Sequence, residues 1–135
     1  RPIVVVNKAQ GRSTLELFLK HFALGYRQVA ADVIVGDNQQ GLKTVAGNVD
    51  AIGYVSIGAA AYEAQQGAPL QLLAVDGVAA TLANVEQGRF PIARPLNLVT
   101  PPAASARADA FIRFAQSAAV ADIIQQHYFI PADAS

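Results

Sequence analysis

Short apolar runs alternate with amphipathic segments along this chain. Residues 3–6 form a β-branched run of the kind that makes a buried strand. From about residue 13 to residue 23, apolar side chains recur every three or four positions, which predicts a helix with one buried face. The apolar residues of that face are Leu15, Phe18, Leu19 and Phe22.

The same alternation continues to the end of the sequence. Further strands are expected at residues 29–35, 51–55, 70–75 and 96–100. Further helices are expected at residues 38–46, 56–66, 105–117 and 120–128, the first of them capped by Asp37 or Asn38, and a short helix or loop is expected at 81–87. Strands that alternate with helices predict an α/β domain, with a mixed, largely parallel sheet and flanking helices.

Composition narrows the class of protein. The chain has 135 residues, enough for one domain with a real core. Its 10 basic and 10 acidic side chains cancel, which argues against a nucleic-acid partner. There is no cysteine, so thiolate metal sites and disulfides are excluded. No apolar run approaches the roughly 20 residues of a membrane span, so no membrane insertion is expected.

The loop after the first strand carries the best candidate chemistry. Gly11, Arg12, Ser13 and Thr14 lead into a helix start, where free backbone amides and the positive end of the helix dipole favour an anion. Ser13 and Thr14 add hydroxyl groups, and the Arg12 guanidinium can donate two parallel hydrogen bonds to an oxyanion. Lys8 would assist electrostatically. Arg12→Ala is therefore expected to weaken anion binding more than Lys8→Ala.

A plainer interpretation of this loop stays open. Ser13 or Thr14 could be an ordinary helix cap, and Arg12 could pair with Glu16 one turn along the helix. In that case the loop would have a structural role and no ligand.

Catalysis is not expected. Ser13 lacks the surrounding glycines of a nucleophile elbow. Only His21 and His127 could act as a base, and His21 lies two turns down the helix from Ser13. No pair of carboxylates is brought together by the sequence. The chain is therefore expected to be non-enzymatic, with no cofactor and no metal.

Four segments, taken in order, resemble the periplasmic phosphate-binding proteins of ABC transporters. They are IVVVNKAQGRSTLELF at 3–18, AIGYVS at 51–56, DGV at 76–78 with NVEQGRFPIARPL at 84–96, and FIRFAQS at 111–117 with FIP at 129–131. The resemblance extends over essentially the whole chain. It implies a periplasmic binding protein type II-like domain that binds phosphate or a related oxyanion.

The resemblance also implies where the ligand lies. The basic residue of the family's ligand loop falls at Lys8, and its serine, glycine and threonine fall at Arg12, Ser13 and Thr14. Only Thr14 is retained, so the positive charge has moved from the loop towards the helix start. Anion binding is expected to survive this change, while selectivity for phosphate is left open.

In the family, two lobes close on the ligand. The resemblance implies that residues 1–93 form the core of the second lobe and that residues 94–135 form the return segment to the first. The first lobe's proton-accepting acid would precede Ile3, as would a signal peptide, and neither is in this chain. The implied setting is periplasmic or extracytoplasmic, with an ABC transporter permease as partner of the full-length protein.

A different class of function also remains. A half-clamp, meaning one lobe without the other, could bind no solute and act instead as a protein-interaction or self-association module. Several apolar side chains after residue 95 would pack against the other lobe in a complete clamp. They are Leu96, Leu98, Phe111, Phe114, Ile123 and Ile124. Either the C-terminal helices fold back over the domain's own sheet, or two copies bury these side chains together. Of the two, a homodimer is expected, with exchange of the C-terminal element about the stiff prolines at 101–102 as one form of it.

Overall fold

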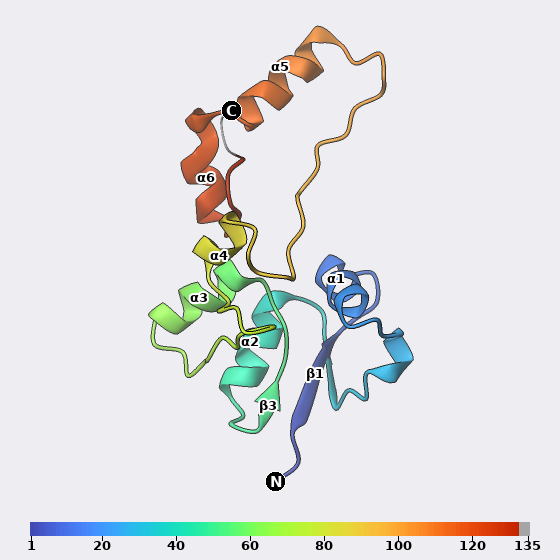
Figure 1. Ribbon diagram of the computed structural model, residues 1–135, viewed down its shortest axis with the longest axis vertical. Helices are drawn as coiled ribbons and strands as arrows, with labels where there is room; N and C mark the ends of the chain where they lie inside the picture. Colours follow the sequence, from blue (N-terminus) through green and yellow to red (C-terminus); the bar gives the residue numbers. More distant parts are fainter. Residues whose placement is uncertain (133–135) are drawn as a thin grey trace. The chain divides into compact units, whose positions relative to one another are not determined.

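The computed structural model describes residues 1–132 (Figure 1). The chain divides into two compact units, residues 1–93 and residues 94–135. The first unit holds a parallel sheet with flanking helices, which confirms the predicted α/β class. In the part of the second unit that the structure describes, the regular structure is helical and lies within residues 106–126.

In the first unit, three parallel strands form a sheet in the order β2-β1-β3. The strands are β1 Val4–Lys8, β2 Val33–Val35 and β3 Ala51–Ile52. The helical segments are α1 Ser13–His21, η1 Tyr26–Gln28, α2 Asn38–Ala46, α3 Ile57–Gln65 and α4 Leu82–Glu86. The predicted helices at 13–23, 38–46 and 56–66 are confirmed, and of the helix or loop predicted at 81–87 the structure has the helix. The predicted strands at 3–6, 29–35 and 51–55 are found in shorter or shifted form.

The central strand β1 sets which side chains meet helix α2. Side chains alternate along a strand, so Val6 and Lys8 lie on one face and Asn7 on the other. Lys8 pairs with Val35 in the sheet register. Helix α2 contacts all three strands, and the last residue of β1 therefore lies near the start of this helix.

Glycine at position 53 permits the close packing of α2 on the sheet. A Cβ atom there would lie 3.2 Å from Cγ2 of Val45 and 3.3 Å from Cβ of Val6. Contacts this short would push the helix from the strand. The missing side chain at Gly53 is thus a packing requirement.

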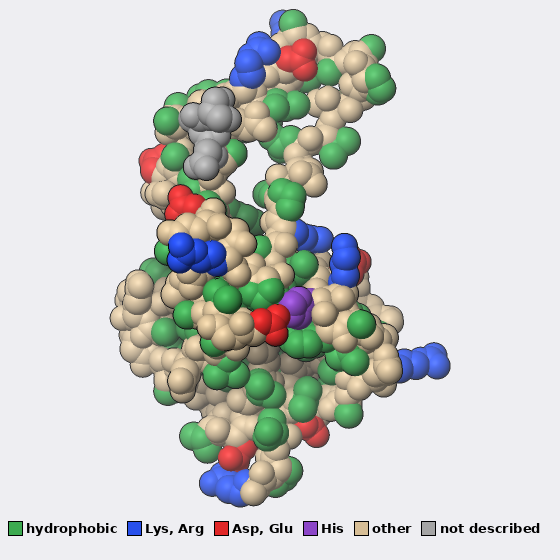
Figure 2. Space-filling view, viewed as in Figure 1, with side chains coloured by type: hydrophobic (Ala, Val, Ile, Leu, Met, Phe, Trp, Pro, Cys, Tyr) green, Lys and Arg blue, Asp and Glu red, His purple; other side chains and the backbone are tan. Residues whose placement is uncertain are grey.

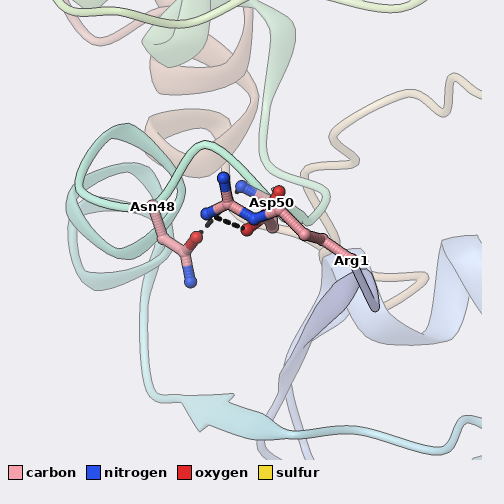
Figure 3. Close-up of polar contacts among 3 residues, drawn as sticks. All are labelled: Arg1, Asn48 and Asp50. Atoms are coloured by element: carbon pink, nitrogen blue, oxygen red, sulfur yellow. Dashed lines mark hydrogen bonds and ion pairs between the residues drawn. The ribbon is translucent and has the colours of Figure 1, made fainter.

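The N-terminus is attached to the turn before β3 (Figure 3). The Arg1 guanidinium lies 2.7 Å from an Asp50 carboxylate oxygen, and the Asp50 N–H donates to Oδ1 of Asn48 at 3.0 Å. The N–H of Val4 donates to the Asp50 carbonyl at 2.9 Å. Because Arg1 is largely exposed, the ion pair contributes little stability, and the backbone bond defines the register.

The core of this unit lies between α2 and α3. Leu42, Ala59 and Ala60 are buried together, with Val55, Leu70 and Leu72 packed against them. The strand predicted at residues 70–75 is wrong. A strand requires a hydrogen-bonded neighbour, and this segment has only an isolated bridge between Val75 and Val78. Leu70 and Leu72 pack against the core without a sheet, whereas Leu73 is exposed.

The second unit contains α5 Ala106–Ala115, η2 Ala118–Val120 and α6 Ala121–Gln126. The helices predicted at 105–117 and 120–128 are confirmed. The strand predicted at 96–100 is wrong, because within residues 1–132 no strand lies beside it to accept its backbone hydrogen bonds. Hydrophobic side chains lie at the surface of this unit (Figure 2).

None of the helices in residues 1–132 has the length and apolar character needed to cross a membrane.

Candidate functional site

Three loops meet at the carboxyl ends of the parallel strands, the edge at which open α/β sheets bind ligands. Lys8 ends β1, Asn38 begins α2 after β2, and Ser56 caps α3 after β3. Their side chains are joined by hydrogen bonds. The Lys8 ammonium donates to Oδ1 of Asn38, and Nδ2 of Asn38 donates to Oγ of Ser56 at 3.4 Å.

Lys8 is the buried charge of this site. Only 3% of its surface is exposed, although lysine is among the residues least often buried. Its Nζ donates to Oγ1 of Thr14 at 2.7 Å as well as to Asn38. Nζ also lies 5.8 Å from the centre of the Tyr54 ring. Neutral acceptors and an aromatic ring therefore surround the ammonium.

Burial lowers the pKa of Lys8 from 10.5 to about 8, because desolvation penalises the charged form. The Asp37 carboxylate opposes this shift and the Arg12 guanidinium adds to it. At neutral pH the ammonium is still mostly protonated. The site therefore holds a positive charge that a bound anion can neutralise.

Tyr54 contacts Lys8 and is itself held by Asn7 and Phe18. The Tyr54 hydroxyl donates to Oδ1 of Asn7, which is fully buried, and accepts the backbone N–H of Lys8 at 3.4 Å. The ring of Phe18 stacks on that of Tyr54, with centroids 4.2 Å apart and planes 6° from parallel. Burial raises the pKa of Tyr54, so its hydroxyl keeps its proton and the donor direction is preserved.

The start of α1 leaves its first amides available beside Lys8. Gly11 has φ +85°, a left-handed conformation that favours glycine, and turns the chain into the helix. Arg12 is the N-cap and no side chain caps this end. By contrast, Asp37 caps α2 by accepting from the N–H of Gln40 at 2.8 Å, and Ser56 caps α3. Free amides and the helix dipole thus face the site from α1.

The structure brings together only some of the residues expected to bind the anion. Lys8 and Thr14 are in direct contact. Gly11 and Arg12 lie on the exposed loop before α1, and Ser13 is the exposed first residue of this helix. Within residues 1–132 there is no Arg12–Glu16 ion pair, so the plainer role proposed for Arg12 has no support.

Asn38 and Ser56 are the site residues that sequence reasoning missed. The sequence predicts only a capping role for Asn38, yet Asp37 fills that role and leaves the Asn38 side chain free to meet Lys8. For Ser56 the sequence indicates only the start of the helix at 56–66 and the end of a family motif, with no role for its side chain. The available signal was positional: each of these polar residues follows a strand of the sheet within a few residues.

The arrangement supplies hydrogen-bond donors around a positive charge, a combination suited to an anion. Among residues 1–132 there is no cluster of three histidine, cysteine, aspartate or glutamate side chains that could hold a metal ion. His21, the candidate base on α1, has its Nε2 atom 3.7 Å from an Asp76 carboxylate oxygen.

Residues 1–119 match a family model described as the PBP superfamily domain. The chain belongs to this superfamily. It is 31% identical over 104 residues to Phosphate-binding protein PstS 2 of Streptococcus pneumoniae, an alignment that covers 76% of the chain and 34% of that relative. The resemblance drawn from the sequence motifs is thereby confirmed.

Two solved structures of the superfamily have the same fold. A phosphate-binding protein of a phosphate ABC transporter from Streptococcus pneumoniae matches with a TM-score of 0.79 and 26% identity, covering 100% of this chain and 53% of that one. A putative phosphate ABC transporter substrate-binding protein from Clostridium perfringens, solved with bound phosphate, matches with a TM-score of 0.73 and 25% identity, covering 98% and 53%. The chain spans about half the length of these proteins.

The lowered pKa of Lys8 predicts how stability depends on pH. Lys8 has a pKa of 10.5 in the unfolded chain and of about 8 in the folded chain. Between these two pH values the unfolded chain therefore binds more protons than the folded chain. The free energy of unfolding should therefore rise by about 2 kcal/mol from pH 8 to pH 10. Urea unfolding in buffers without phosphate or sulfate measures this rise.

Lys8→Met should remove the rise, and Lys43→Met, which deletes an exposed lysine from α2, should preserve it. An equal pH dependence in all three proteins would contradict the burial of the Lys8 ammonium.

Proposed function

We propose that this chain binds phosphate or a related oxyanion as part of an ABC transporter solute-binding protein, and that it is not an enzyme. The observation that carries the proposal is the buried Lys8 ammonium beside the uncapped start of α1. A buried positive charge with only neutral contacts is stabilised when an anion arrives. The ligand would take donors from the ammonium, the Thr14 hydroxyl and the backbone amides of Gly11 to Thr14.

The relatives support phosphate as the first ligand to test. The curated relative is named as a phosphate-binding protein, and both solved relatives are named as parts of phosphate ABC transporters. Their names also motivate the proposed setting. We place the full-length protein outside the cytoplasmic membrane, where it would deliver its ligand to a transporter permease.

Titration calorimetry of the 135-residue chain with phosphate and sulfate tests this function. We expect both anions to bind with Kd no tighter than about 1 μM, because this chain offers donors from a single lobe. Sulfate keeps its charge between pH 8 and pH 9, so a change in its affinity over this range comes from the protein alone. It should fall about fivefold from pH 8 to pH 9 as Lys8, with a pKa of about 8, loses its proton. Nanomolar binding by a monomer, or no binding of either anion, would contradict the proposal.

Two variants identify which cation matters most. The sequence alone predicts a larger loss of binding from Arg12→Ala than from Lys8→Ala. From the burial of Lys8 we expect the reverse, because a desolvated charge interacts more strongly than an exposed one. Lys8→Met should weaken sulfate binding by about tenfold or more, and Arg12→Ala by less. Lys43→Met is the matched control for loss of one positive charge. If Arg12→Ala proved the more damaging, Lys8 would not be the centre of the site.

Self-association belongs to the proposal as well. Exposed fractions in the second unit are 76% for Leu96, 89% for Val99, 63% for Phe111 and 55% for Phe114. Burying such side chains is favourable by roughly 1.5–3 kcal/mol each, so two copies should associate through them. Light scattering should show a mass that rises with protein concentration towards that of a dimer. The double variant with Phe111→Ser and Phe114→Ser should show a smaller rise. A strict monomer at every concentration would remove this part of the proposal.

A further inference from the structure

The hydrogen bonds of Lys8 leave one donor for a ligand. An ammonium carries three N–H groups. Thr14 and Asn38 accept two of them. Because the Thr14 hydroxyl accepts from Lys8, its own proton must point to another acceptor. The remaining ammonium N–H and the Thr14 O–H are therefore both free to meet an anion.

The direction of the bonds at Asn38 follows from the same argument. An ammonium can only donate, so the atom of the Asn38 side chain that meets Lys8 has to be its oxygen. The amide nitrogen then faces Oγ of Ser56, which also accepts the N–H of Ala59 at 3.4 Å. With its oxygen occupied by two donors, Ser56 keeps its hydroxyl proton for a third group. Asn38 thus accepts a hydrogen bond from Lys8 and donates one to Ser56, which leaves the Ser56 hydroxyl as a donor.

We propose that Asn38 is a positioning residue of the anion site: its amide holds the Lys8 ammonium against Thr14 and orients the Ser56 hydroxyl as a donor. This inference rests on the proposed oxyanion-binding function. It adds two residues from the loops after β2 and β3 to a site otherwise built on the loop after β1.

A neutral amide suits this position better than a carboxylate. The charged or titratable groups that act on Lys8 are Asp37 from the same loop as Asn38, and Arg12 from the start of α1. Tyr54 faces it from the loop after β3. Asp37 is exposed and caps α2, so it offsets the buried charge only in part. Asn38 supplies an acceptor without cancelling the positive charge that would attract the ligand.

The contact between Asn38 and the Lys8 ammonium can be tested without any ligand. The chain has three lysines, Lys8, Lys20 and Lys43, so carbon-13 lysine labelling gives three side-chain signals, and Lys8→Arg assigns one of them. Lys8 should titrate near its lowered pKa of about 8. In Asn38→Ala its pKa should fall further, because an acceptor that stabilises the charged form is lost. In Asn38→Asp the added carboxylate should raise it.

The role in binding is tested by calorimetry with phosphate and with sulfate. Asn38→Ala should weaken both by about three- to tenfold, the range expected for one hydrogen bond that orients a charged group. Asn38→Asp should weaken both at least as much, because its carboxylate neutralises Lys8 and repels the anion. Gln39→Ala, the exposed neighbour on α2, should change neither the lysine titration nor the affinity.

The outcomes separate this inference from the function beneath it. If the chain binds oxyanions and Asn38→Ala changes neither the Lys8 titration nor the affinity, Asn38 does not position Lys8. If the Lys8 titration shifts as expected but the unaltered chain binds neither anion, the proposed function fails and the positioning role falls with it. Asn38→Asp keeps an oxygen acceptor of the same size. It therefore provides the titration test even if the alanine variant folds poorly.

Discussion

An ammonium group buried at the end of a central strand must be surrounded by hydrogen-bond acceptors, because its desolvation is otherwise too costly. The neighbourhood of Lys8 follows from this constraint. Thr14 at the start of α1 and Asn38 at the start of α2 accept its protons, and Tyr54 lies beneath it. These contacts join the three loops at the carboxyl edge of the sheet. The site and the local fold therefore depend on the same charge.

The three helix starts at this edge have different roles. Asp37 and Ser56 satisfy the first amides of α2 and α3, whereas no side chain does so for α1. The uncapped start of α1 also lies beside the buried ammonium, which donates to Thr14 there. An anion bound there would meet both an unsatisfied helix end and a positive charge that Asp37 compensates only in part. This is a physical reason for ligand binding that is independent of the superfamily's other members.

Local parts of this structure could be predicted from the sequence. The apolar run of β1, the turn at Gly11 and the amphipathic period of α1 identified the loop that holds Lys8 and Thr14. The partners of Lys8 could not be found in this way. Asn38 lies 30 positions away, and only the strand order β2-β1-β3 brings it close. The predictions of strands at 70–75 and 96–100 were wrong for a related reason, since the apolar character of a segment does not provide it with a hydrogen-bonded neighbour.

Nitrogen-15 NMR during titration with phosphate tests the central claim most directly, because it locates the ligand on the chain. The account predicts shifts at the backbone amides of Gly11, Arg12, Ser13 and Thr14, with smaller shifts at Asn38 and Ser56, where the other two loops reach Lys8. Saturating phosphate that left these amides unmoved, or shifts confined to residues 94–132, would contradict an anion site built around Lys8.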